Sequence, residues 1–168
     1  GGYTAKKFSK EGYRIAMLAR SAERLERFEK ELDGSKGYVC DVSNIDHLKE
    51  ICAKVKKEMG APEVLIHNAV KGNFETLLNG KPEWLEENFR INTTSLMYLA
   101  HALLPDMVKA KKGVIIVTGN TAAKRGIANT PYFAPTKAAQ RILAQSLAKD
   151  FGPKGIHVAY LIVDASIN

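Results

Sequence analysis

The feature that most constrains this sequence is a series of short apolar runs in which apolar and polar residues do not alternate. A strand that faces solvent on one side alternates with a period of two, whereas a strand buried on both faces is apolar throughout. We therefore predict that these runs form a parallel β-sheet covered on both faces. The predicted strands are residues 13–18 (YRIAML), 36–40, 64–67 (VLIH), 114–118 (VIIVT) and 158–163 (VAYLIV).

The segments between the runs carry helical patterns with recognisable ends. Ser21 and Ser43 are predicted N-caps, because a serine side chain can accept a hydrogen bond from the first turn, and Gly60 is a predicted stop. Pro105 is expected to bend or end its helix. The predicted helices cover residues 22–32, 44–59, 82–106 and 133–150. This strand–helix alternation predicts right-handed βαβ units, and hence an α/β fold with a doubly wound parallel sheet in three layers, α/β/α.

Composition narrows the function classes. With 168 residues, 45% of them hydrophobic, and no repeat or linker, the chain is expected to form a single domain over residues 1–168. No apolar run is long enough to span a bilayer and no signal peptide is recognised, so we expect no membrane partner. Cys40 and Cys52 are predicted to be small core residues in a reducing, cytoplasmic compartment. The net charge of +7 suits an anionic cofactor or a lysine-rich surface, and no basic–aromatic interleaving favours a nucleic acid.

Polar and small residues follow each predicted strand. In a doubly wound sheet, ligands bind beyond the carboxyl ends of the strands. The residues at these positions are Ala19-Arg20-Ser21, Asp41-Val42, Asn68-Ala69-Val70, Gly119-Asn120-Thr121 and Asp164-Ala165-Ser166. Each is weak evidence alone, because Ser21 or Asp41 could simply cap a helix or form a turn.

Six segments in order give a stronger signal together than any gives alone. They are Gly1 with the helix and strand after it, CDVS, HNAV, NFRINTTS, FAPTKAA and GPKGIHVAYLIVD. In this order and spacing the chain resembles the short-chain dehydrogenase/reductase family over essentially its whole length. Val70 stands where the family usually has glycine, and Asp164-Ala165 replaces the usual Pro-Gly. The resemblance implies a Rossmann-like fold whose first strand precedes Gly1 and whose last elements follow Asn168, so that the chain is truncated at both ends relative to the family.

The resemblance also implies a nicotinamide-dinucleotide site. Gly1 would let the backbone approach the pyrophosphate at a helix N-terminus, and Asp41 would accept a hydrogen bond from the adenine amino group. Arg20 with Ser21 favours NADP(H) over NAD(H), because a guanidinium pairs well with a 2′-phosphate, whereas an acidic residue there would hold the ribose hydroxyls of NAD. An ordinary exposed arginine before a helix cap is the alternative. The full set is Gly1, Arg20, Ser21, Asp41, Val42, Asn68, Ala69 and Lys137.

The implied catalytic site departs from the family pattern. Family members use a tyrosine to give or take the proton, a lysine that lowers its pKa and holds the ribose, a serine that orients the substrate oxygen, and an asparagine that supports a water relay. Lys137 and Asn92 match the lysine and the asparagine, Asn120 aligns with the serine, and Phe133 aligns with the tyrosine. Residues four apart on a helix are offset by roughly 40° and residues five apart by roughly 140°, so Phe133 shares a face with Lys137 and Tyr132 does not. Tyr132 stays an alternative if the helix begins later.

Three interpretations follow. The first is an oxidoreductase of an atypical subgroup with phenylalanine at the tyrosine position, which transfers hydride between NADP(H) and a small-molecule carbonyl or alcohol through a degenerate active site. The second is a non-catalytic NADP(H)-binding sensor or partner subunit, and the third, least favoured, is a nucleic-acid binder. The family also pairs through its two long helices, here residues 82–106 and 133–150, so a homodimer or homotetramer is implied, unless these faces are intramolecular core.

Overall fold

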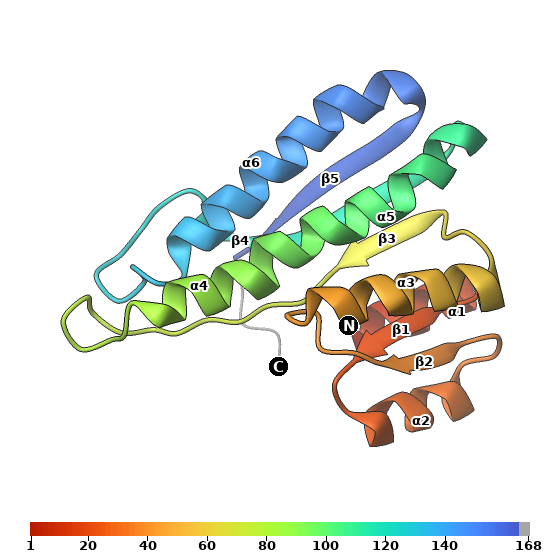
Figure 1. Ribbon diagram of the computed structural model, residues 1–168, viewed down its shortest axis with the longest axis horizontal. Helices are drawn as coiled ribbons and strands as arrows, with labels where there is room; N and C mark the ends of the chain where they lie inside the picture. Colours follow the sequence, from red (N-terminus) through yellow and green to blue (C-terminus); the bar gives the residue numbers. More distant parts are fainter. Residues whose placement is uncertain (165–168) are drawn as a thin grey trace. The chain divides into compact units, whose positions relative to one another are not determined.

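The computed structural model describes residues 1–164 and divides the chain into two compact units, Gly1–Ala61 and Pro62–Asn168. In each unit parallel strands alternate with helices (Figure 1). The predicted α/β fold with parallel sheets is therefore confirmed. A single domain over residues 1–168 stays a prediction.

The first unit contains a two-stranded parallel sheet and three helices. In chain order its elements are α1 (Gly2–Lys10), β1 (Ala16–Ala19), α2 (Ala22–Glu31), β2 (Lys36–Val39) and α3 (Ile45–Met59). β1 pairs with β2 so that Ala16 lies opposite Lys36. The buried side chains of this unit include Leu25, Tyr38, Leu48 and the free thiols Cys40 and Cys52, as predicted for the cysteines. Burial raises the pKa of Cys40 to about 11.

The element ends in the first unit confirm some sequence predictions and correct others. Ser21 caps α2 by accepting from the Arg24 amide at 3.3 Å, as predicted. The cap of α3 is Asn44 rather than Ser43, because the Ser43 hydroxyl donates to Asp41 and Asn44 accepts from the His47 amide at 3.1 Å.

Two further ends of the first unit follow from local backbone geometry. Gly60 ends α3 with a φ of 87°, a conformation that favours glycine, and so acts as the predicted stop. β1 begins later than predicted, because the Tyr13 amide donates to the Phe8 carbonyl and the two rings pack edge to face at 5.2 Å. Tyr13 therefore packs against the end of α1 and lies outside β1.

The second unit contains a three-stranded parallel sheet in the order β3–β4–β5. Its elements are β3 (Val64–His67), α4 (Glu83–Phe89), a π-helical turn (Arg90–Thr94), α5 (Ser95–Ala110), β4 (Gly113–Asn120), a 3₁₀ turn (Thr121–Ala123), α6 (Ala134–Phe151), a second 3₁₀ turn (Gly152–Lys154) and β5 (Ile156–Val163). Val64 lies opposite Val114, and Val117 lies opposite Tyr160. Helices α5 and α6 lie side by side along this sheet (Figure 1).

The long helix predicted over residues 82–106 is wrong in two respects. A π-helical turn interrupts it at Arg90–Thr94, and its second part continues past Pro105 to Ala110. A proline in a helix leaves the carbonyl four residues earlier without its N–H donor. Pro105 and His101 are both exposed, so water can bond that carbonyl and the helix continues. Helix α6 starts after Phe133 with Pro135 in its first turn, as predicted.

Within residues 1–164, no helix has the length and apolar character that crossing a membrane requires.

Candidate active site

Lys137 is an unusual side chain of the second unit, because a lysine is rarely fully buried. It lies in the first turns of α6 and is 1% exposed. Its Nζ donates to the Thr118 carbonyl near the end of β4 at 3.0 Å and to Gln140 Oε1 at 2.5 Å. Burial lowers the pKa of Lys137 to about 8. The unit therefore holds a buried ammonium group whose pKa is lower than that of an ordinary lysine.

Phe133 precedes Lys137 on the same helix face. It is 3% exposed, its carbonyl accepts from the Lys137 amide, and its ring packs against Phe74 at 5.0 Å. A benzyl ring carries no exchangeable proton, so it contributes packing here and no acid–base group.

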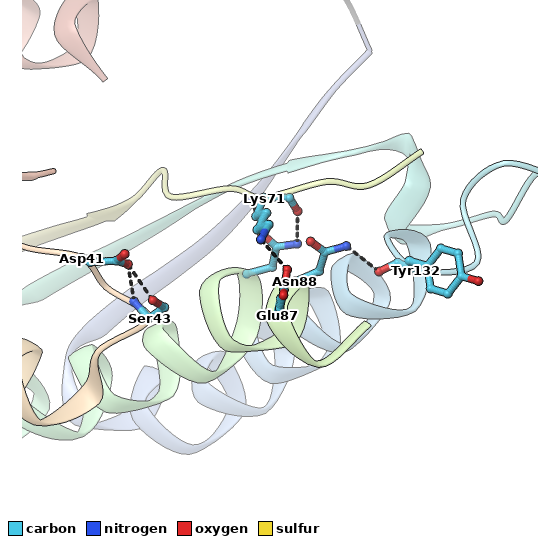
Figure 2. Close-up of polar contacts among 7 residues, drawn as sticks. Asp41, Ser43, Lys71, Glu87, Asn88 and Tyr132 are labelled. Carbon is cyan, nitrogen blue, oxygen red and sulfur yellow. Dashed lines mark hydrogen bonds and ion pairs between the residues drawn. The ribbon is translucent and has the colours of Figure 1, made fainter. Parts of the chain in front are cut away.

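Tyr132 is also buried, and its side chain has other partners than Lys137. Its hydroxyl donates to the Leu77 carbonyl at 2.6 Å, and its ring packs edge to face with that of Trp84, with the ring centroids 5.7 Å apart. Its backbone carbonyl accepts from Asn88 Nδ2 at 2.9 Å, and Figure 2 shows its ring directed away from Asn88. The structure therefore directs the Tyr132 hydroxyl at the loop before α4 and does not bring it to Lys137.

Asn120 ends β4 and carries an unsatisfied acceptor. Its Oδ1 is buried and has no hydrogen-bond partner within residues 1–164. Leaving a buried acceptor unpaired costs about 1–3 kcal/mol, so a hydrogen bond from a ligand or a water molecule would stabilise this atom. Next to it, Gly119 makes room for the ring of Tyr160, whose hydroxyl donates to the Lys137 carbonyl at 3.3 Å.

Asn92 links three segments that are far apart in the sequence. It lies in the π-helical turn and is fully buried. Its Oδ1 accepts from the Lys71 amide, and its Nδ2 donates to the Lys71 carbonyl and to Thr136 Oγ1, all at 2.8 Å. The Lys71 ammonium also forms an ion pair with Glu87 on α4 (Figure 2). The side chain of Asn92 therefore fastens the loop after β3 to the start of α6.

Two buried residues that extend the hydrogen bonds of Lys137 into the second unit were not predicted from the sequence. Gln140 is fully buried, and its Nε2 donates to the Asn92 carbonyl at 2.6 Å and lies 3.2 Å from His67 Nδ1. His67 is 2% exposed, and its Nε2 lies 2.8 Å from Ser95 Oγ. Burial, assisted by the Lys137 charge, lowers the pKa of His67 to about 4. The available signals were a histidine that ends an apolar run and a glutamine one turn after Lys137.

The predicted cofactor residues of the first unit sit where strands end and helices begin. Gly1 is the exposed N-cap of α1, and Arg20 is exposed between β1 and α2. Ser21 caps α2 as described above. Asp41 forms a turn, because its Oδ1 accepts from the Ser43 amide at 2.9 Å and the Ser43 hydroxyl at 2.7 Å (Figure 2). Ser21 and Asp41 thus perform the cap and turn roles that the sequence left open, and neither role prevents contact with a ligand.

The remaining predicted positions lie after strands. Val42 is half-buried in the first unit, beside Asp41. Asn68 is exposed and Ala69 is half-buried after β3 in the second unit. Asp164 follows β5 and is exposed, whereas Ala165 and Ser166 lie outside the described residues. The four predicted catalytic positions, Lys137, Phe133, Asn92 and Asn120, all lie in the second unit.

Comparison of the sequence with known protein families identifies the family to which the chain belongs. The family model described as short chain dehydrogenase matches residues 1–163. The chain is 26% identical over 159 residues to the 3-oxoacyl-[acyl-carrier-protein] reductase FabG of Buchnera aphidicola, covering 94% of this chain and 65% of that protein. It is 28% identical over 161 residues to the serine 3-dehydrogenase of Agrobacterium fabrum, covering 94% of this chain and 64% of that enzyme. The chain thus spans slightly less than two thirds of the length of these relatives.

Solved structures agree with the fold. A metagenomic short-chain oxidoreductase in complex with NADP superposes with a TM-score of 0.92 at 26% identity, covering 99% of this chain and 77% of that chain. A short-chain dehydrogenase from Streptomyces avermitilis superposes with a TM-score of 0.89 at 24% identity, covering 96% of this chain and 60% of that chain. The second likeness carries information about the fold alone.

Proposed function

The chain belongs to the short-chain dehydrogenase family, and from that premise we propose that it is part of an oxidoreductase that binds NADP(H) and interconverts a small-molecule carbonyl and alcohol through a degenerate active site. In this proposal Phe133 occupies the position of the family's tyrosine, so the chain belongs to an atypical subgroup. The observation that carries the proposal is the buried ammonium of Lys137, held beside the end of β4 where Asn120 lies.

The residues of the second unit fit a polar, hydroxyl-bearing ligand. A lysine ammonium has three N–H donors, and Thr118 and Gln140 take two of them. The third can donate to a ribose hydroxyl of the cofactor. The unpaired Oδ1 of Asn120 can accept from a hydroxyl of a substrate or cofactor, which would satisfy the buried acceptor. Asn68 and Ala69 would line the ribose of the adenosine half.

The residues of the first unit favour the phosphorylated cofactor. The exposed guanidinium of Arg20, with the Ser21 hydroxyl, would hold the 2′-phosphate of NADP(H). Gly1 would lie against the pyrophosphate, and Asp41 with Val42 would contact the adenine. The NADP-bound state of the similar metagenomic oxidoreductase supports this preference over NAD(H).

Proton transfer is the step that the degenerate site alters. The bound nicotinamide would supply or take the hydride. Phe133 cannot supply the accompanying proton, and loss of a positioned acid–base residue typically lowers a rate by about 10²–10⁴. With its pKa lowered to about 8, the Lys137 ammonium is the side chain in this unit best suited to give that proton, which would be the one that otherwise bonds the ribose hydroxyl. The Asn120 amide would orient the substrate oxygen.

Assembly and location also stay proposals. Met97 and Tyr98 on α5 and Ile142 on α6 are exposed large apolar side chains on the two helices through which the family pairs. A homodimer or homotetramer would cover them. Ala134, Ala144 and Leu147 are instead buried within the unit, so they belong to its core. The two free thiols fit a cytoplasmic location.

The cofactor proposal is tested by thermal shift with NADPH and NADH side by side. A ligand at one hundred times its Kd stabilises the folded protein by about 2.7 kcal/mol, which is readily measured. We expect a larger shift with NADPH, reduced selectively by Arg20→Ala and unchanged by the control Arg24→Ala on the exposed face of α2. Equal shifts with both cofactors would remove the NADP(H) preference, and no shift with either would overturn the proposal.

The chemical proposal is tested by turnover. We expect slow NADPH oxidation with some members of a panel of ketones and aldehydes, and a faster rate in Phe133→Tyr, because that variant restores a phenol one turn before Lys137. Phe151→Tyr at the far end of α6 is the matched control and should leave the rate unchanged. NADPH binding without turnover in both the parent and Phe133→Tyr would refute catalysis while leaving cofactor binding intact.

A further inference from the structure

A chain of hydrogen bonds runs from Lys137 into the interior of the second unit. The Lys137 ammonium donates to Gln140 Oε1, and Gln140 Nε2 faces both the Asn92 carbonyl and His67 Nδ1. His67 Nε2 lies 2.8 Å from Ser95 Oγ, and Ser95 Oγ donates to the Ile91 carbonyl at 2.7 Å. The chain consists of the side chains of Lys137, Gln140, His67 and Ser95, and all four are buried. Only Lys137 is one of the predicted site residues.

The chemistry of the end groups fixes the direction of every bond in this chain. An ammonium group cannot accept a hydrogen bond and a carbonyl cannot donate one. Gln140 must therefore present its oxygen to Lys137 and its NH₂ group to the Asn92 carbonyl and His67. His67 Nδ1 must then be unprotonated, so its proton lies on Nε2 and is donated to Ser95, whose own proton goes to Ile91.

We propose that Gln140 and His67 are positioning residues that hold the Lys137 ammonium in place, with neutral His67 fixing the orientation of the Gln140 amide. A proton on His67 Nδ1 would face the Gln140 NH₂ group, donor against donor. Rotating the amide to relieve that contact would turn its NH₂ group toward the Lys137 ammonium. The tautomer of His67 therefore keeps Gln140 Oε1 directed at the Lys137 ammonium. It does so without contact between the histidine and the lysine.

The consequence for the cofactor rests on the proposed function. The Thr118 carbonyl and Gln140 Oε1 approach Nζ from two directions, which leaves one defined direction for its third proton. If Lys137 binds a ribose hydroxyl, that direction decides how well the hydroxyl is held. Loss of the Gln140 acceptor should then weaken binding even though Gln140 does not touch the ligand.

The first test reads the state of the His67 ring by long-range ¹H–¹⁵N NMR, assigned by the signal that His67→Asn removes. We expect a neutral ring protonated at Nε2 at pH 7. In Gln140→Glu a carboxylate oxygen would replace the NH₂ group, so we expect a proton on Nδ1. The control Gln145→Glu, exposed on the same helix, should leave the ring unchanged. A wild-type ring protonated at Nδ1, or a Gln140→Glu ring that stays Nε2-protonated and neutral, would overturn the proposal.

The second test measures NADPH affinity in folded variants. Loss of the hydrogen bond between the Lys137 ammonium and the ribose hydroxyl would weaken NADPH affinity about tenfold or more. We expect this loss of affinity for Gln140→Leu and not for Gln145→Leu. We expect His67→Asn, which keeps an acceptor, to bind NADPH more tightly than His67→Leu. Equal affinity in Gln140→Leu and the parent would overturn the positioning role. If the parent itself binds no NADPH, the proposed function fails, and the NMR result still decides the proposal about His67 and Gln140.

Discussion

The burial of His67 predicts an acid-sensitive contribution to the stability of the second unit. In the unfolded chain its imidazole titrates near 6.5, whereas burial and the Lys137 charge lower its pKa to about 4 in the folded unit. At a pH between these two pKa values, His67 is protonated in the unfolded chain and neutral in the folded unit. The contribution is therefore fully present above pH 6.5 and is lost as the pH falls toward 4.

The size of the effect follows from the same two values. Each pH unit between the two pKa values changes the free energy of unfolding by about 1.4 kcal/mol. From pH 7 to pH 5 the loss from His67 is therefore about 2 kcal/mol, because little changes above pH 6.5. This is a large part of the 5–15 kcal/mol that stabilises a typical domain.

Urea denaturation at pH 7, 6 and 5, followed by fluorescence of Trp84 in the second unit, measures this loss. His67→Asn lacks the titrating ring, so the difference in unfolding free energy between parent and variant should shrink by about 2 kcal/mol from pH 7 to pH 5. Groups that titrate in both proteins cancel in that difference. His157→Asn, at an exposed position on β5, controls for removal of a histidine in general. A difference that is constant across this range would refute the reasoning, since it would mean that His67 accepts its proton equally well in both states.

Three further predictions concern packing and helix ends. Gly119→Ala should cost about 1–3 kcal/mol, because the added methyl would overlap the Tyr160 ring, and the cost should largely vanish in a Tyr160→Ala background; additive effects in this double-mutant cycle, measured by urea denaturation, would contradict it. Ser21→Ala should lower the stability of the first unit by about 1 kcal/mol through loss of the α2 cap, whereas Ser21→Asp should not; circular dichroism during denaturation checks both. Thr136→Val should cost about 1–3 kcal/mol because it removes the acceptor of Asn92 Nδ2, and Thr136→Ser should recover most of that loss in the same assay.

The sequence predicts elements well where one local rule decides them. β3 and both ends of α6 lie within one residue of their predicted bounds, because a short apolar run and a proline in the first turn leave few alternatives. The cap of α3 was misplaced because Ser43 and Asn44 are both good caps. The choice between them depends on Asp41, which takes the Ser43 hydroxyl.

The candidate site was predictable only in part. Lys137, Asn92 and Asn120 could be named as candidates because they fall at positions that the family motifs mark. His67 and Gln140 are 73 residues apart in the chain, and they meet only because β3 pairs with β4 and α6 lies against that sheet. Apolar periodicity gives no information about such a pair, because a buried polar residue reads simply as an interruption of the pattern. Buried polar side chains of this kind follow from the packing of helices on the sheet, which the sequence does not specify locally.

Asn92 also has a consequence for how the second unit opens. The Lys71 amide proton is held by an asparagine that is itself bonded to the Lys71 carbonyl and to Thr136. Exchange of this proton with deuterated solvent therefore requires the loop to leave Asn92, which breaks two bonds of one side chain together. The amide proton of Lys71 should therefore exchange far more slowly than those of its neighbours in the loop. Its exchange rate should rise when Thr136 is replaced by valine.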